Sequence, residues 1–180
     1  MPILIALALF AAQDSEPRGD ALLKAVMLRA HNAARAAVKV PPVAWDDALA
    51  ADARAYAAEM AASGRFEHAV QLADKPHQGE NLWEGTIGAY GYAEMADAWV
   101  REKRWFVNLP APGFSTTGDG HDVGHYTQMI WSRTRHIGCA LASGGGRDYL
   151  VCRYAAPGNM LGQTAIPTPP PKPALRRIRR

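Results

Sequence analysis

Two strand-like stretches around a glycine run restrict the fold of this chain more than any other feature. HIGCALA (136–142) and YLVCRYA (149–155) are rich in β-branched, aromatic and aliphatic residues, and SGGGRD (143–148) separates them. A short loop with consecutive glycines between two such runs is typical of a β-hairpin. We therefore expect an antiparallel pair of strands near the end of the folded region.

The register of this hairpin places the two cysteines of the chain opposite each other. If the turn is centred on Gly145 and Gly146, Cys139 faces Cys152. Opposed residues in an antiparallel pair have Cα atoms about 4.5–5.5 Å apart, which overlaps the range for disulfides. The register favours a disulfide and hence an oxidising compartment, with two buried free thiols as the alternative. The same face would carry Ile137, Leu141, Leu150 and Tyr154.

Three helices are predicted before the hairpin. Apolar residues recur at helical spacing over about 21–38, 47–62 and 91–105, with Asp20 and Asp46 as N-caps of the first two. Helices that precede a short antiparallel sheet indicate an α+β fold arranged in layers. With 180 residues and 48% hydrophobic content, the chain suits one globular domain, which we place at 19–165.

The two ends of the chain differ from this domain. Residues 1–18 begin with the apolar run MPILIALALFAA, which indicates a signal peptide and is too short for a transmembrane helix. Residues 166–180 form a proline-rich tail that we expect to be disordered. The formal net charge falls from +3 to −2 without the five basic residues of the tail. Contact with an anionic surface and simple solvation both suit this tail, and nothing indicates specific nucleic-acid binding.

One carboxylate lies on an apolar helix face. Tyr92, Met95 and Trp99 form the apolar stripe of the third predicted helix, and Glu102 is the next position along it. A carboxylate there is costly unless it is paired. The alternative is that Glu102 extends to solvent at the end of the helix.

Three further polar residues stand between apolar runs, in what we interpret as loops or short turns. They are His68 in RFEHAV, Glu80 in QGENLWEG and His125 in GHYTQMIWS. Together with Glu102 they form a credible metal site, because imidazole nitrogens bind zinc and carboxylates bind the ion or orient the rings. A structural role for each residue is the alternative.

A second pair of histidines competes with this set. His121 and His125 are four residues apart and could chelate one metal on a helix. Nearby glycines argue against a helix that reaches back to His121. His77 follows a proline, and we expect it to be solvated.

Eight segments in order resemble the CAP superfamily, which comprises cysteine-rich secretory proteins, antigen 5 proteins and plant pathogenesis-related proteins of group one. The resemblance covers about residues 20–163. The segments are HNAAR (31–35), VAWDDALAADARAYA (43–57), FEHA (66–69), GENLW (79–83), AWVREK (98–103), GHYTQMIW (124–131), IGCA (137–140) and VCRYAAPGNMLGQ (151–163).

The resemblance implies a three-layer α-β-α sandwich with a central antiparallel sheet and a cleft. The cleft residues implied by the matching motifs are His68, Glu80, Glu102 and His125. A divalent metal, most often zinc, would bind through the two histidines. The family disulfide falls on Cys139 and Cys152, and the HNAAR motif would connect the first helix to the core.

For function, the resemblance implies a secreted or periplasmic protein that binds a divalent metal and recognises a small ligand or a protein partner, without enzymatic activity. One alternative is a metal-dependent hydrolase, acting on peptide or lipid, with Glu80 and Glu102 as its candidate catalytic residues. Another is a sterol- or fatty-acid-binding module lined by the aromatic stretch 90–105. A third is a scaffold with a vestigial site.

The chain also departs from the family. Ala69 replaces the serine that often follows the first histidine, and there is no G-x-S-x-G segment, so serine-hydrolase chemistry is not expected. The additional disulfides and the cysteine-rich C-terminal domain of many eukaryotic members are absent.

Overall fold

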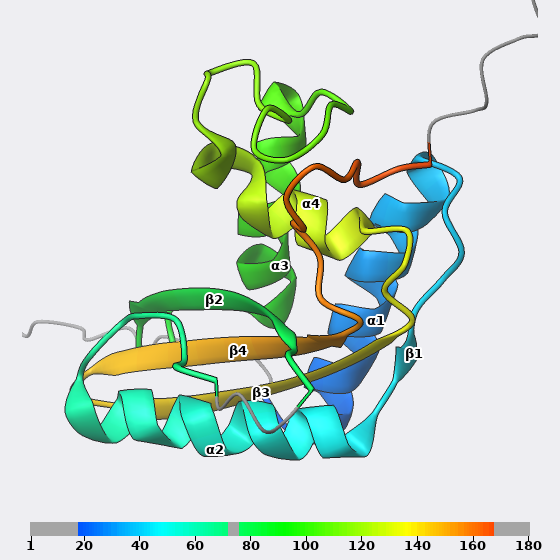
Figure 1. Ribbon diagram of the computed structural model, residues 1–180. Helices are drawn as coiled ribbons and strands as arrows, with labels where there is room; N and C mark the ends of the chain where they lie inside the picture. Colours follow the sequence, from blue (N-terminus) through cyan, green and yellow to red (C-terminus); the bar gives the residue numbers. More distant parts are fainter. Residues whose placement is uncertain (1–17, 72–75, 168–180) are drawn as a thin grey trace, which may run out of the picture.

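A four-stranded sheet forms the middle layer of the protein. The computed structural model describes residues 18–71 and 76–167 (Figure 1). The strands are β1 (Ala44–Trp45), β2 (Gly79–Thr86), β3 (His136–Gly144) and β4 (Arg147–Ala155), in the order β1-β3-β4-β2. The pairs β2–β4 and β3–β4 are antiparallel, whereas the short β1 runs parallel to β3. The antiparallel sheet is therefore confirmed, with one parallel strand added at its edge.

The predicted hairpin is present with the predicted register. Gly145 and Gly146 form its turn with φ angles of 57° and 80°, a region that glycine enters without steric cost. Cys139 pairs with Cys152, their Cα atoms are 4.1 Å apart, and the two residues form a disulfide. The hairpin thus confirms the cysteine pairing expected from the sequence.

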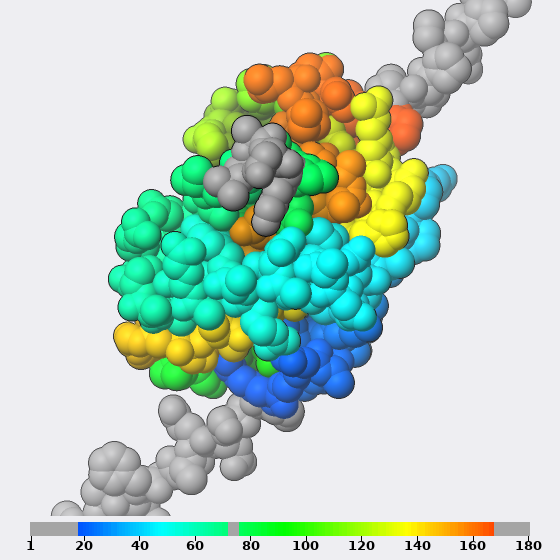
Figure 2. Space-filling model, turned by 60° about the horizontal axis from the view of Figure 1, so that its bottom comes forward, coloured from blue at the N-terminus to red at the C-terminus, as the bar shows by residue number. Residues whose placement is uncertain are grey.

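Helix α2 (Asp47–Ser63) covers one face of the sheet (Figures 1 and 2). As predicted, Asp46 is its N-cap and accepts hydrogen bonds from the amides of Ala48 and Leu49. The helix lies close to β3 because Gly138 and Gly144 leave room for it. A Cβ atom at either glycine would meet the α2 backbone at 2.1 Å. Small and apolar side chains fill this layer: Ala53, Ala57, Met60, Leu82, Ala140, Tyr149 and Val151.

The remaining helices lie on the opposite face. They are α1 (Asp20–Ala37), α3 (Tyr92–Val100) and α4 (Gly124–Ile130), with 3₁₀ helices η1 (Arg101–Trp105) and η2 (Gly120–Val123). This arrangement confirms the three-layer α-β-α sandwich (Figure 1). Two predicted details were wrong. The N-cap of α1 is Gly19, because Asp20 is already helical. The third helix changes from α to 3₁₀ geometry after Val100, so Glu102 lies in η1.

The HNAAR motif connects α1 to the core, as expected. Nδ1 of the buried His31 lies 2.7 Å from the Met27 carbonyl oxygen, and Nε2 lies 2.8 Å from the Tyr154 hydroxyl. A carbonyl oxygen only accepts, so Nδ1 carries the proton and Nε2 accepts from Tyr154. Burial lowers the pKa of His31 to about 4. Arg35 donates to four carbonyl oxygens, those of Pro41, Met129, Trp131 and Thr134.

The described ends of the chain are attached to the domain. Arg18 forms an ion pair of 2.8 Å with the buried Asp148. At the other end Ala165 is fully buried, and the Ile166 amide donates to Asn108. The predicted signal peptide, apart from Arg18, and the predicted tail from residue 168 onward lie outside the described residues. Within the described part, no helix is long and apolar enough to cross a membrane.

Candidate functional site

His125 is held by a carboxylate and an aromatic ring. It is the second residue of α4, and its Nδ1 lies 2.6 Å from Oε1 of Glu102. The other oxygen of Glu102 accepts from the Tyr126 amide at 2.9 Å. The imidazole stacks on Trp99 with 6.0 Å between ring centroids and 14° between planes. Both oxygens of Glu102 are therefore engaged in orienting His125 and the start of α4.

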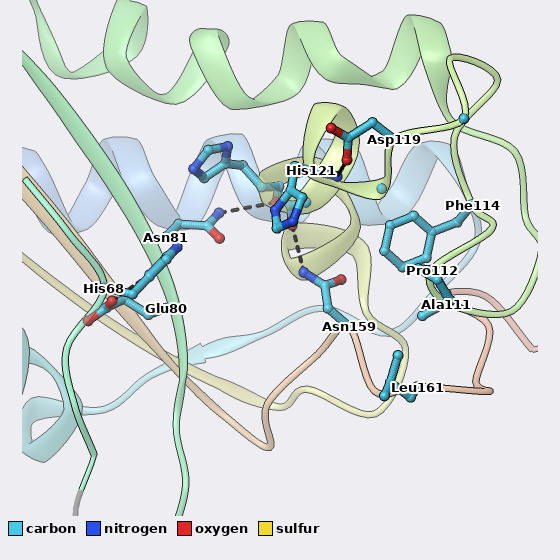
Figure 3. A pocket seen from close by; sticks show the side chains of 14 residues that line it. His68, Glu80, Asn81, Ala111, Pro112, Phe114, Asp119, His121, Asn159 and Leu161 are labelled. Atoms are coloured by element: carbon cyan, nitrogen blue, oxygen red, sulfur yellow. Dashed lines mark hydrogen bonds and ion pairs between the residues drawn. The ribbon is translucent and has the colours of Figure 1, made fainter.

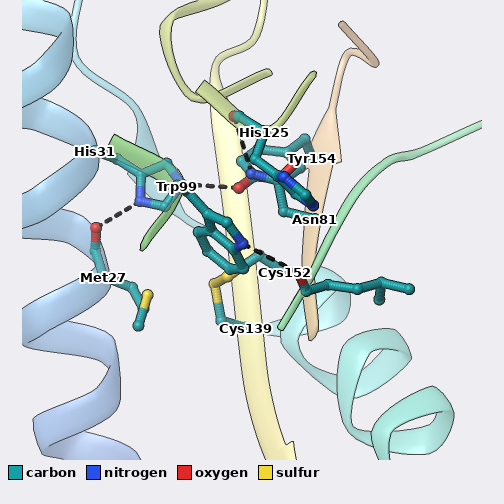
Figure 4. The surroundings of a disulfide bond; sticks show 9 residues. Met27, His31, Asn81, Trp99, His125, Cys139, Cys152 and Tyr154 are labelled. Carbon is teal, nitrogen blue, oxygen red and sulfur yellow. Dashed lines mark hydrogen bonds between the residues drawn. A yellow bond between two sulfur atoms is a disulfide. The ribbon is translucent and has the colours of Figure 1, made fainter. Parts of the chain in front are cut away.

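Trp99 links this arrangement to the core. Its indole N–H donates to the Leu82 carbonyl oxygen at 3.0 Å, and only 2% of the residue is exposed. Trp99 belongs to the same buried cluster as the disulfide between Cys139 and Cys152 (Figure 4). The aromatic stripe of the third helix is thus core, and the Glu102 that follows it turns to His125 rather than to bulk solvent.

The second histidine is positioned by the sheet. His68 lies in the segment after α2, and its Nδ1 is 2.7 Å from Oε1 of Glu80 on β2. The same oxygen accepts from the Ala69 amide at 3.1 Å. The other oxygen of Glu80 lies 2.8 Å from Nη2 of Arg153, which is directly opposite Glu80 on β4. The prediction that Glu80 lies in a loop was wrong, because β2 includes it.

The two His–Glu pairs share one pattern. In each pair, the glutamate accepts a hydrogen bond from Nδ1 of the histidine and another from the backbone amide of the residue after that histidine. Because a carboxylate oxygen only accepts, Nδ1 carries a proton in both pairs, and Nε2 is the ring nitrogen left for other partners. Each glutamate thereby fixes both the tautomer and the orientation of its ring.

A single cavity of about 570 Å³ joins the two histidines. Figure 3 shows His68 and Glu80 on its strand side and Asp119 and Phe114 on the opposite, loop side. Its lining residues are His68, Glu80, Asn81, Ala111, Pro112, Phe114, Gly118, Asp119, Gly120, His121, Gly124, His125, Asn159 and Leu161. Of the four predicted cleft residues, His68, Glu80 and His125 line this cavity, and Glu102 lies behind His125.

The competing pair is not on one α-helix, in agreement with the glycines that argue against a helix reaching back to His121. His121 lies in η2 and His125 in α4, so they are not on successive turns of one α-helix. His121 does line the cavity, and its amide donates to Asp119 at 2.8 Å. Within residues 18–71 and 76–167, no group of three or more His, Cys, Asp or Glu side chains is arranged to hold a metal. His77 is exposed, as expected.

Three residues of the site were not found from the sequence. Arg153 pairs with Glu80, and Asn81 and Asn159 line the cavity. Asn159 donates from Nδ2 to the Gly124 carbonyl oxygen and accepts at Oδ1 from Thr127, which fixes the start of α4. Recognition of β2 as a strand would have revealed the Glu80–Arg153 pair, because the two residues are directly opposite.

Comparison with known families decides the classification. The family described as "CAP: Cysteine-rich secretory protein family" matches residues 28–154. The chain belongs to the CAP family. It is 40% identical over 135 residues to a pathogenesis-related protein of PR-1 type from Sambucus nigra, covering 74% of this chain and 76% of that protein. It is 37% identical over 138 residues to pathogenesis-related protein 1C from Nicotiana tabacum, covering 76% and 77%.

Solved CAP structures share this fold. The structure of NaASP2 with Zn²⁺ matches with a TM-score of 0.69 and 24% identity, over 88% of this chain and 90% of NaASP2. Venom allergen-like protein 4 from Schistosoma mansoni matches with a TM-score of 0.63 and 20% identity, over 82% and 96%. At these identities the likeness concerns the fold.

Proposed function

We propose that this CAP protein is secreted and binds a divalent metal, with zinc the first candidate, through Nε2 of His68 and His125, and that its cleft recognises a small ligand or a protein partner. The observation that carries the proposal is the paired arrangement in which a glutamate engages Nδ1 of each histidine. The disulfide and the family description support an oxidising, extracellular location.

The donor set fits a metal with open coordination positions. Imidazole nitrogens bind zinc, and metal-binding histidines almost always donate their other ring N–H to a carboxylate or a carbonyl group. Two protein ligands leave the remaining positions to water or to a ligand, so we expect moderate affinity. When bound, such a metal supplies Lewis acidity, and a structural relative solved with Zn²⁺ makes zinc the ion to test first.

The same contacts favour binding over catalysis. A general base needs an oxygen that is free to accept a proton from water. Both oxygens of Glu102 accept hydrogen bonds, and Oε1 of Glu80 accepts from His68 and Ala69. Oε2 of Glu80 has no hydrogen bond, but it is buried and lies 2.8 Å from the Arg153 guanidinium, which holds it away from the cavity water. These contacts argue against the metal-dependent hydrolase. Burial of the aromatic stripe from Tyr92 to Trp99 in the core argues against a lipid site there.

Calorimetric titration of the full chain with zinc tests the proposal. We expect one saturable site that is lost when His68 and His125 are both replaced by alanine. The matched control replaces His77 and His136, two exposed histidines outside the cavity, and should leave binding unchanged. A separate His121→Ala variant measures any contribution from that ring. Zinc binding of equal affinity in the His68/His125 variant would contradict the proposal.

A further inference from the structure

Asn81 is a buried residue of the cavity with a fixed orientation. It lies on β2 next to Glu80, lines the cavity and is only 1% exposed. Its Nδ2 is 3.1 Å from the carbonyl oxygen of His125. A carbonyl oxygen only accepts, so the amide nitrogen must point to it and the amide oxygen must point the other way. This contact determines which end of the carboxamide faces the cavity.

The oxygen of this carboxamide has no protein partner in the described part of the chain. Among residues 18–71 and 76–167, Asn81 makes a single side-chain hydrogen bond, the one from its nitrogen. Figure 3 shows the oxygen beside that nitrogen, at the tip of the side chain, with no dashed line to another lining residue. The atom is not fully enclosed, because it reaches the surface of the cavity, where solvent can bond to it. A bound N–H or O–H group can take the place of solvent at this acceptor.

The polar side chains near Asn81 present acceptors as well. Nε2 of His68 and of His125 carries a lone pair in the neutral tautomer, and Asp119 is a carboxylate whose Oδ1 accepts only from a backbone amide. Asn159 uses one N–H for the Gly124 carbonyl oxygen, and Asn159 and Asn81 each keep a second N–H. His121 can donate or accept. This end of the cavity presents several acceptors beside a few donors, which suits a molecule that carries both N–H and C=O groups.

The other end of the cavity is apolar. Ala111, Pro112, Phe114 and Leu161 line it, opposite the strand that carries Asn81 (Figure 3). The volume of about 570 Å³ is within the usual range for small-molecule sites. A ligand that fits both ends carries hydrogen-bond donors next to a compact apolar group. The backbone of a peptide with an aliphatic side chain has this arrangement.

We infer that Asn81 is a specificity-determining residue of the cleft, whose Oδ1 accepts a backbone N–H from a short peptide segment while the apolar end holds an aliphatic side chain of the same segment. This rests on the ligand-recognition part of the proposed function and does not require the metal. A peptide N–H replaced by an ester oxygen loses this bond and places two acceptors against each other. Discrimination between amide and ester is the measurable consequence.

The experiment titrates three probes into the full-length, isotopically labelled protein, with metals removed by a chelator, and follows NMR shifts. The probes are N-methyl-4-methylpentanamide, which carries a single amide N–H beside an aliphatic group, its ester analogue methyl 4-methylpentanoate, which has no N–H, and octanoate. We expect the amide to bind about three- to tenfold more tightly than the ester, the gain typical of one net hydrogen bond. We also expect the side-chain NH₂ signals of Asn81 to shift, and octanoate to leave the cleft signals unchanged.

Asn81→Ala should remove the preference for the amide. The matched control is Asn108→Ala, which removes an asparagine outside the cavity whose side chain is hydrogen-bonded to the backbone of Ile166, and it should keep the preference. The wild-type comparison stands by itself if a variant fails to fold. Absence of cleft shifts with the amide, equal affinity for amide and ester, or a preference that persists in Asn81→Ala would each overturn the inference. Because metal is absent, failure here is distinguishable from failure of zinc binding.

Discussion

The two His–Glu pairs have the same hydrogen bonds but different surroundings. The side chain of His125 is 34% exposed and rests on Trp99, whereas the side chain of His68 is 67% exposed and rests on no aromatic ring in the described residues. Glu80, in turn, is more buried than Glu102, at 5% against 16%, and contacts Arg153. We call these the helical half and the strand half of the cleft.

The comparison indicates two ways to fix a histidine. The helical half uses packing, because Trp99 supports the ring and Arg35 fixes the carbonyl groups at the end of α4. The strand half uses charge, because a buried ion pair holds the carboxylate and leaves the histidine near solvent. Loss of packing should damage stability most, and loss of the exposed ring should damage it least.

Trp99→Ala should have the largest effect. Removal of a buried tryptophan costs about 3–5 kcal/mol, and here it also removes the support of His125. Urea unfolding should therefore show a loss of this size in the free energy of unfolding. The half-buried Trp83 offers a control, since it packs on Tyr90 rather than on a cleft histidine. Equal losses for Trp83→Ala and Trp99→Ala would argue that Trp99 has no special role.

Arg153→Met should rank second. It leaves the Glu80 carboxylate buried without its ion-pair partner, which typically costs roughly 3 kcal/mol. Glu80→Gln combined with Arg153→Met should recover part of this loss, because the unpaired charge is then absent. A double-mutant cycle by urea unfolding measures the coupling. Additive losses would show that the ion pair does not hold the strand half.

Acid should weaken the packing behind the helical half through His31, whose ring lies edge-on to Trp99. Burial disfavours the charged ring and lowers its pKa to about 4 in the folded protein, against 6.5 for a free histidine. The unfolded chain therefore binds more protons between these values, and stability falls as pH decreases through this window. The expected loss is roughly 2 kcal/mol between pH 7 and pH 5. Urea unfolding at both pH values should show this component in the wild type and not in His31→Gln.

Local patterns predicted the parts of the protein whose contacts are local. Alternation and a glycine turn placed Cys139 opposite Cys152, and helical spacing marked Glu102 as anomalous. Strand β2 was missed because Gly79, Asn81 and Gly85 have low strand propensity and the strand is at the edge of the sheet. Its pairing with β4 follows from tertiary packing, which no local pattern contains.

The cleft required information beyond local patterns. His125 and Glu102 are 23 residues apart, and Asn81 contacts the His125 carbonyl group from 44 residues away. The resemblance to the CAP superfamily predicted the four cleft residues, because the matching motifs belong to a fold in which long-range packing brings these positions together. It did not supply Arg153 or Asn81, since their roles appear only when the strand register and the hydrogen bonds of the side chains are known.

The smallest effect should come from the exposed histidine. His68→Ala removes a largely solvated ring, so we expect the free energy of unfolding of the metal-free protein to change by about 0.5 kcal/mol or less. His125→Ala removes a stacked ring and should cost about 1–2 kcal/mol. Both substitutions should nevertheless weaken zinc binding to a similar extent, because each removes one of two ligands. Equal stability losses, measured by urea unfolding with a chelator present, would contradict the division into a packed half and a charged half.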